Sequence, residues 1–230
     1  MSMTRVAATV HKWLALAALV PILFWFLSGL FFAISPIERV RSEHRIAHRP
    51  SRQVTLADAA AGLKLLASQG AADAAKIEIR SLVGRPVALV THGPGRPVLF
   101  DLRSAKPLSP IPAATARAIA ANDYDGPGKV TDIVAVTRNS PEYRGALPAW
   151  EVRLASDDRL SIYVAADTGQ VTARRSSLWR TYDWLWGLHI LDLKDHENFN
   201  SALLIAAVTS ALLLLASGIV LIPARFGWIR

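Results

Sequence analysis

Two long apolar runs without a charged residue constrain this chain more than any other feature. The first covers residues 13–34 and the second residues 202–222. A helix rises about 1.5 Å per residue, so about 20 apolar residues cross the hydrocarbon core of a bilayer. We therefore predict transmembrane helices at 13–34 and 201–222, with the lipid bilayer as the first partner.

The composition agrees with a membrane protein and excludes several other classes. Hydrophobic residues make up 52% of the chain, and no cysteine is present, which excludes disulfides, thiolate metal sites and cysteine nucleophiles. The formal net charge of +8 is carried largely by arginines that flank the apolar runs. Arginines in such positions typically meet lipid headgroups or acidic ligands. No nucleic-acid-binding motif accompanies the charge, so no nucleic-acid partner is predicted.

Two spans place both ends of the chain on one side of the membrane. The first run is longer than the apolar core of a cleaved signal peptide, and only Arg5 and Lys12 are charged before it. We therefore expect a retained helix, with residues 1–12 and 223–230 in the cytoplasm. The predicted protein is a multi-pass inner-membrane protein whose main domain is periplasmic.

The middle of the chain reads as two copies of one unit after a basic tether at 35–52. Each copy has a short alanine-rich helix followed by three strand-like runs with glycine-containing turns. The predicted α+β fold has two transmembrane helices flanking two α-β-β-β repeats, at 53–108 and 109–176. The expected helices are 54–68 and 112–121, and the expected strands are 76–83, 86–91, 97–102, 129–138, 149–154 and 160–165.

The chain resembles the PepSY-associated transmembrane proteins. The likeness is carried by the repeats, by the closing turn at 167–169, and by motifs at 11–16, 36–44, 186–192 and 198–200. Larger relatives resemble haem-bearing inner-membrane reductases that act on ferric siderophores. PepSY units elsewhere are associated with inhibiting or folding peptidases. The resemblance thus implies two different classes of function.

An aromatic segment at 177–200 contains His189, which lies close to the start of the second apolar run. A titratable ring at a membrane boundary is costly unless it is paired, hydrated or bound, which makes it a candidate site. Without cysteine, imidazole is the natural axial ligand for haem iron. If 180–193 is an interfacial helix, its 3.6-residue period places one potential haem ligand, His189, on an apolar face. The residues of this face are Tyr182, Leu185, Trp186, His189 and Leu193.

The expected depth in the membrane decides which other histidine could share a haem iron with His189. His44 and His189 both lie on the outer side of their spans, so we predict that they share a haem b iron. His11 lies on the opposite side and needs a partner from a second copy or another protein, so a homodimer or larger redox partner is expected. Candidate propionate partners are Arg41, Arg45 and Arg180. The competing interpretation is that His189 only anchors the chain, bonded to a carboxylate such as Asp192 or Glu43.

Two functions follow from these features. The first is a haem b-binding electron-transfer component that serves ferric-siderophore or iron reduction, which leaves open whether the chain is itself an oxidoreductase. The second is a haem-free, membrane-anchored module whose exposed strand edges bind a peptide, a protease or a partner subunit. No catalytic side chain is predicted for either function.

Overall fold

The computed structural model describes residues 3–49, 53–71 and 73–227. It divides into a membrane unit (Met1–Pro36 and Thr181–Arg230) and a sheet unit (Ile37–Arg180), and each is described by itself. Four parts of the segments predicted above lie outside the described residues: 1–2 and 228–230 at the ends, 50–52 in the basic tether, and 72 in the first repeat.

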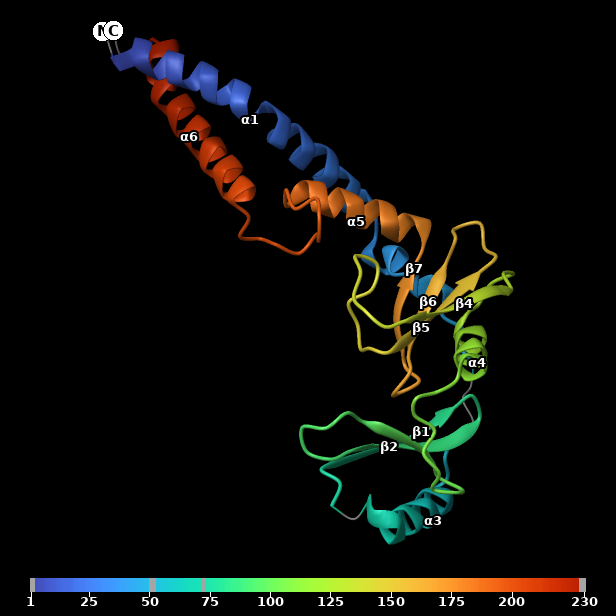
Figure 1. Cartoon of the computed structure of the whole chain (residues 1–230). Helices are drawn as coiled ribbons and strands as arrows, with labels where there is room; N and C mark the ends of the chain where they lie inside the picture. Colours follow the sequence, from blue (N-terminus) through green and yellow to red (C-terminus); the bar gives the residue numbers. More distant parts are fainter. Residues whose placement is uncertain (1–2, 50–52, 72, 228–230) are drawn as a thin grey trace. The chain divides into compact units, whose positions relative to one another are not determined.

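The membrane unit is built from two long helices that run antiparallel beside each other, α1 (Met3–Ile34) and α6 (Ala202–Arg225) (Figure 1). The stretches Arg5–Ile34 and Ala202–Pro223 are long and apolar enough to cross a membrane, which confirms the two predicted spans. Ser201 begins α6, because its side chain accepts a hydrogen bond from the backbone N–H of Leu204 at 3.1 Å. A third helix, α5 (Ser177–His189), precedes the bend before α6.

The first repeat in the sheet unit is one helix and an antiparallel three-stranded sheet. The helix α3 (Leu56–Leu66) starts at Thr55, which accepts a hydrogen bond from the backbone N–H of Asp58. The strands follow in the order β1-β2-β3, with bounds Lys76–Leu82, Arg85–Thr91 and Val98–Asp101. Helix and strands agree with the predicted pattern to within about two residues at each end, a usual uncertainty for such boundaries.

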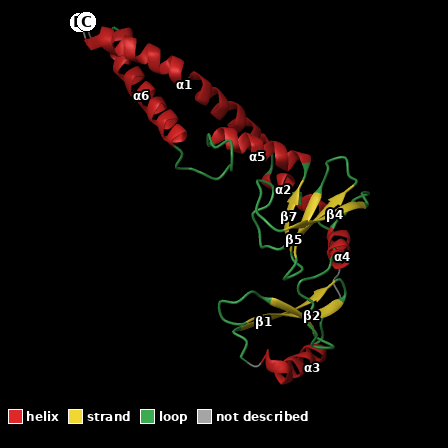
Figure 2. Cartoon of the chain, viewed as in Figure 1, coloured by secondary structure: helices red, strands yellow, loops and turns green. Residues whose placement is uncertain are grey.

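The second repeat differs from the prediction by one strand. Its helix α4 (Ala113–Asp123) is followed by an antiparallel sheet in the order β4-β5-β6-β7, with bounds Val130–Val136, Ala149–Leu154, Ser161–Ala165 and Val171–Arg175. The turn predicted at 167–170 is present, with Gly169 at φ +67°, but it joins β6 to β7 where we expected it to close the domain. Figure 2 shows α3 and α4, each with the sheet of its own repeat.

The interior strands β2 and β6 hold the sheet unit together because both of their faces are buried. In β2, Val87 and Leu89 enter a core shared with α4 and the second sheet, whereas Ala88 and Val90 pack beneath α3. Successive side chains on a strand point to opposite faces, so one strand serves two cores. The shared core makes the two repeats one body.

Part of the segment predicted as a tether is folded onto the second repeat. Residues 37–49 contain a short helix α2 (Ile37–Val40) and a 3₁₀ turn η1 (Glu43–Arg45). The backbone N–H of Ala47 donates to the carbonyl of Asp123 at 2.7 Å, and that of Asp125 donates to Arg45 at 2.8 Å. These bonds anchor the chain beside the end of α4.

Candidate functional site

The aromatic segment folds as predicted into a helix that presents aromatic rings and His189 on one side. In the membrane unit, Phe32 of α1 lies 4.6 Å from the ring of Tyr182, 6.1 Å from Trp186 and 5.5 Å from His189, measured between ring centroids. The helix ends at His189, which is four residues earlier than expected. Leu193 therefore lies outside the helix and is exposed, and the predicted apolar wall is completed by a ring from α1.

His189 is held at both its backbone and its ring by residues of α1. Its Nδ1 atom lies 2.8 Å from the hydroxyl oxygen of Ser28, and its carbonyl accepts a hydrogen bond from the indole N–H of Trp25 at 2.7 Å. The Ser28 hydroxyl donates its own proton to the carbonyl of Phe24 at 2.5 Å, a back-bond to residue i−4 that serine often makes in helices. The carboxylate partner considered for His189 is replaced by this serine.

These bonds assign the tautomer of His189. A serine hydroxyl has one proton, and that of Ser28 is used on Phe24, so its oxygen accepts the proton on Nδ1 of His189. The lone pair is then on Nε2, for which no hydrogen-bond partner exists among the described residues. Burial lowers the pKa of His189, which keeps the ring neutral. A neutral imidazole with Nε2 open is the form that binds a metal.

His11 repeats this arrangement near the other end of α1. Its Nδ1 atom lies 2.9 Å from the hydroxyl oxygen of Ser217 on α6, and that hydroxyl donates to the carbonyl of Leu214 at 2.8 Å. By the same proton count, Nδ1 of His11 is the donor and Nε2 carries the lone pair. Each end of the helix pair therefore holds one histidine–serine couple.

A model of the family described as "PepSY-associated TM region" matches residues 8–230. The chain belongs to this family. The match covers both membrane helices and both repeats, so this PepSY-associated protein is a membrane protein. Comparisons with curated proteins and with solved structures gave no match.

The other predicted ligands of this PepSY-associated protein lie in the sheet unit. His44 is exposed on the η1 turn and has no hydrogen bond from its ring among the described residues. Arg41 is exposed beside it, and Arg45 lies 3.7 Å from a carboxylate oxygen of Asp158. His44 and His189 belong to different units, so their shared iron stays a prediction, as do the propionate contacts.

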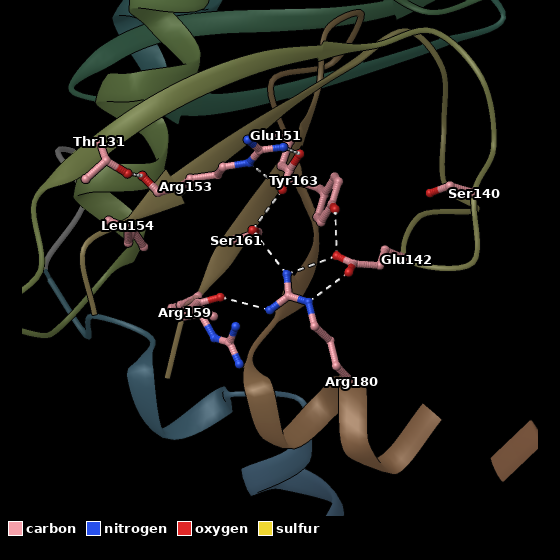
Figure 3. A pocket seen from close by; sticks show the side chains of 11 residues that line it. Thr131, Ser140, Glu142, Glu151, Arg153, Leu154, Arg159, Ser161, Tyr163 and Arg180 are labelled. Carbon is pink, nitrogen blue, oxygen red and sulfur yellow. Dashed lines mark hydrogen bonds and ion pairs between the residues drawn. The ribbon is translucent and has the colours of Figure 1, made fainter. Parts of the chain in front are cut away.

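Arg180, the third propionate candidate, is part of an ion network on the open face of the second sheet (Figure 3). It donates to both carboxylate oxygens of Glu142, at 2.8 and 3.0 Å, and to the carbonyl of Arg159 at 2.9 Å. Arg180 lowers the pKa of Glu142, and burial raises the pKa of Tyr163, whose hydroxyl donates to Glu142. These groups line a cavity of about 580 Å³. Its charges are largely paired within the protein.

The bend after α5 is also tightly bonded. Nδ1 of His196 lies 2.7 Å from a carboxylate oxygen of Asp183, and its ring packs against Gly187. Asp192 accepts hydrogen bonds from the backbone N–H groups of residues 194, 195, 197 and 198, which lower its pKa far below the usual range. His196 and Asp192 therefore shape the bend.

The partners of the histidines were missed by sequence reasoning. No partner within the chain was predicted for His11, and only a carboxylate was considered as the partner of His189. A serine four residues after Phe24 in an apolar run is a weak signal, because such serines usually bond only to their own helix. Among the described residues, no group of three or more His, Asp or Glu side chains is placed to hold a metal ion by itself.

Proposed function

We propose that this PepSY-associated protein binds haem b and carries electrons as part of a system that reduces ferric siderophores or other ferric iron. The observation that supports the proposal is the neutral His189 ring, held by Ser28 at Nδ1 with Nε2 free. Ligating histidines typically donate their other ring N–H to a fixed acceptor in this way. Haem needs only one or two protein ligands, so the lack of a three-ligand cluster among the described residues is compatible with it.

The residues around His189 would orient a bound haem and shield it from water. Ser28 fixes the direction of the His189 ring, and Trp25 fixes the end of the helix that carries it. Phe32 and Trp186 supply apolar surface beside the imidazole. Bound haem would supply one-electron chemistry, and its potential depends on ligation and burial.

The remaining assignments belong to the same proposal. We propose His44, or a histidine of a second copy, as the second axial ligand, and His11 as the ligand of a second haem. Arg41, Arg45 and Arg180 are the proposed propionate partners. The sheet unit would face the periplasm of an inner membrane, where a ferric siderophore could be the electron acceptor and a larger redox protein the donor.

The proposal is tested by the absorbance of protein purified in detergent from haem-replete cells. We expect a Soret band that shifts when dithionite is added. His189→Ala should remove or strongly weaken it, whereas the control His92→Ala should not, because His92 is exposed and faces Asp73 at 3.4 Å. A colourless wild type that also fails to bind added haem would overturn the proposal.

The second candidate function is a haem-free binding module. It is favoured by the edge strands β1, β4 and β7, which pair with a neighbouring strand on one side only. A peptide can add to such an edge as a further strand. Co-purification of one defined peptide or protein with colourless wild type would support this alternative.

A further inference from the structure

A second cavity lies in the sheet unit, away from the histidines of the membrane unit. It has a volume of about 380 Å³ and is bordered by the end of β1, the end of α4 and the start of β7. Its polar lining includes Arg80, Asn122, Asp123, Gln170 and Arg174. This volume lies within the usual range for small-molecule sites, about 300–1,000 Å³.

Arg80 brings a charge into this cavity without an acidic partner. Its side chain is half-buried, and it donates one hydrogen bond to the carbonyl of Thr168. Its Nε atom is buried and has no hydrogen-bond partner. Glu78, the acid whose charge acts on it, is paired with Lys76. Burial lowers the pKa of Arg80, as expected for a cation whose desolvation is poorly compensated.

The other charges of the cavity cancel each other. Asp123 accepts hydrogen bonds from two nitrogens of Arg174, one of them at 2.8 Å. Such a two-bond pair satisfies both partners and leaves the carboxylate little capacity to neutralise a second guanidinium. Arg80 therefore gives the lining one positive charge in excess. A partly desolvated cation without a counter-ion is unfavourable unless another group compensates its charge.

We propose that this cavity binds a small oxyanion, carrying a carboxylate or a phosphate group, through Arg80. A guanidinium is the side chain best suited to carboxylate and phosphate, because its planar fork donates two parallel hydrogen bonds. Asn122 and Gln170 line the same cavity, and a side-chain amide is a group that can donate to a bound oxyanion. This inference is independent of haem, because no residue of the histidine–serine couples takes part.

The experiment uses the full chain in detergent. Its thermal unfolding midpoint is measured in sodium phosphate, sodium succinate and sodium chloride at equal ionic strength, and binding is measured by calorimetric titration. A ligand that binds only the folded state raises the midpoint. We expect phosphate or succinate, but not chloride, to raise the midpoint of the wild type. The two anions distinguish a phosphate site from a carboxylate site.

The variants are Arg80→Gln and Arg117→Gln. Arg117 is exposed on α4, has no ion pair among the described residues, and serves as the matched control. We expect Arg80→Gln to lose at least about tenfold in anion affinity, equivalent to one strong hydrogen-bonded contact, while Arg117→Gln responds like the wild type. In chloride, Arg80→Gln should unfold at the same or a higher temperature, because an uncompensated charge has been removed.

Two results would overturn the inference. One is a wild type that binds neither anion in the titration, which needs no variant to interpret. The other is an Arg80→Gln protein that binds the anion as tightly as the wild type. If Arg80→Gln does not fold, Arg80→Lys replaces it. A loss of at least about tenfold in anion affinity supports binding through two parallel hydrogen bonds from the guanidinium, because lysine cannot make them, and unchanged affinity refutes the inference.

Discussion

Replacing Ser28 with alanine tests the central element of the proposed haem site. In the wild type, the serine oxygen accepts the Nδ1 proton of His189 at 2.8 Å, and the side chain of Ser28 is only 1% exposed. In Ser28→Ala, water has little access to that position, so the Nδ1 proton loses its acceptor. The hydrogen bond that favours the Nδ1–H tautomer is then absent, so the population of the tautomer with a lone pair on Nε2 falls.

The size of the effect follows from the cost of an unsatisfied buried donor. Leaving such a group without a partner costs about 1–3 kcal/mol. At 1.4 kcal/mol per tenfold, this is a loss of about 5- to 150-fold in haem affinity. Removing the outer partner of a metal-binding histidine generally weakens binding about 10- to 100-fold, so two independent arguments agree.

The assay is a haem titration of protein depleted of haem, followed by the Soret absorbance, for the wild type and two variants. The matched control is Ser210→Ala, because the half-buried Ser210 of α6 makes the same back-bond, to Ala206 at 2.8 Å, and has no hydrogen bond to a histidine among the described residues. We expect Ser28→Ala alone to bind haem more weakly. Equal affinities for Ser28→Ala and Ser210→Ala would refute the argument that this serine sets the tautomer.

Three further changes have definite expected outcomes. Gly187→Ala places a methyl group 2.4 Å from the His196 ring and should lower stability by about 1–3 kcal/mol in chemical unfolding. Asp192→Asn should lower the thermal midpoint at pH 7, because the folded pKa of Asp192 is depressed by its backbone hydrogen bonds. The carboxylate stabilises the fold above the ordinary pKa of aspartate, and this contribution is lost as the pH falls toward the lower folded pKa, so the midpoint of the variant should depend less on pH in acid. Glu142→Gln removes a partly exposed ion pair with Arg180 and should cost about 0.5–1 kcal/mol at neutral pH, with the same sign of pH dependence.

The structural features that the sequence predicted correctly are those determined by residues close together in the sequence. The two spans follow from uninterrupted apolar runs, and α3, α4 and six of the strands follow from local periodicity and turn residues. The aromatic face of α5 was also predicted, because Tyr182, Trp186 and His189 recur at helical spacing. Each of these signals is contained within one stretch of chain.

The features that were missed depend on distant residues. The strand β7 (Val171–Arg175) carries two arginines and one valine, so its composition is not that of a typical strand. It forms because β6 offers an unpaired edge, and because Arg174 reaches Asp123 of α4, 51 residues earlier. The contact between Ser28 and His189 spans 161 positions and has no local signature. One sequence cannot predict such pairs without the fold.

The two histidine–serine couples lead to a prediction about stoichiometry. His11 and Ser28 are 17 positions apart on α1, about 26 Å along the helix, so the two histidine–serine couples lie at different depths. A six-coordinate haem iron takes two axial ligands, and among the described residues of the membrane unit each couple offers one. If a second copy supplies the other ligand at both depths, a dimer holds two haems, which is one per chain.

Measuring haem and protein on the same sample, together with the mass of the detergent-solubilised particle, decides between the arrangements. His11→Ala should then halve the haem content and leave the band of the other haem unchanged, and His189→Ala should do the converse. A monomeric particle with one haem that only His189→Ala removes would instead place the second ligand within the chain, with His44 as the candidate. In that case the bond between His11 and Ser217 serves only to join α1 to α6, and Ser217→Ala should lower stability without changing the spectrum.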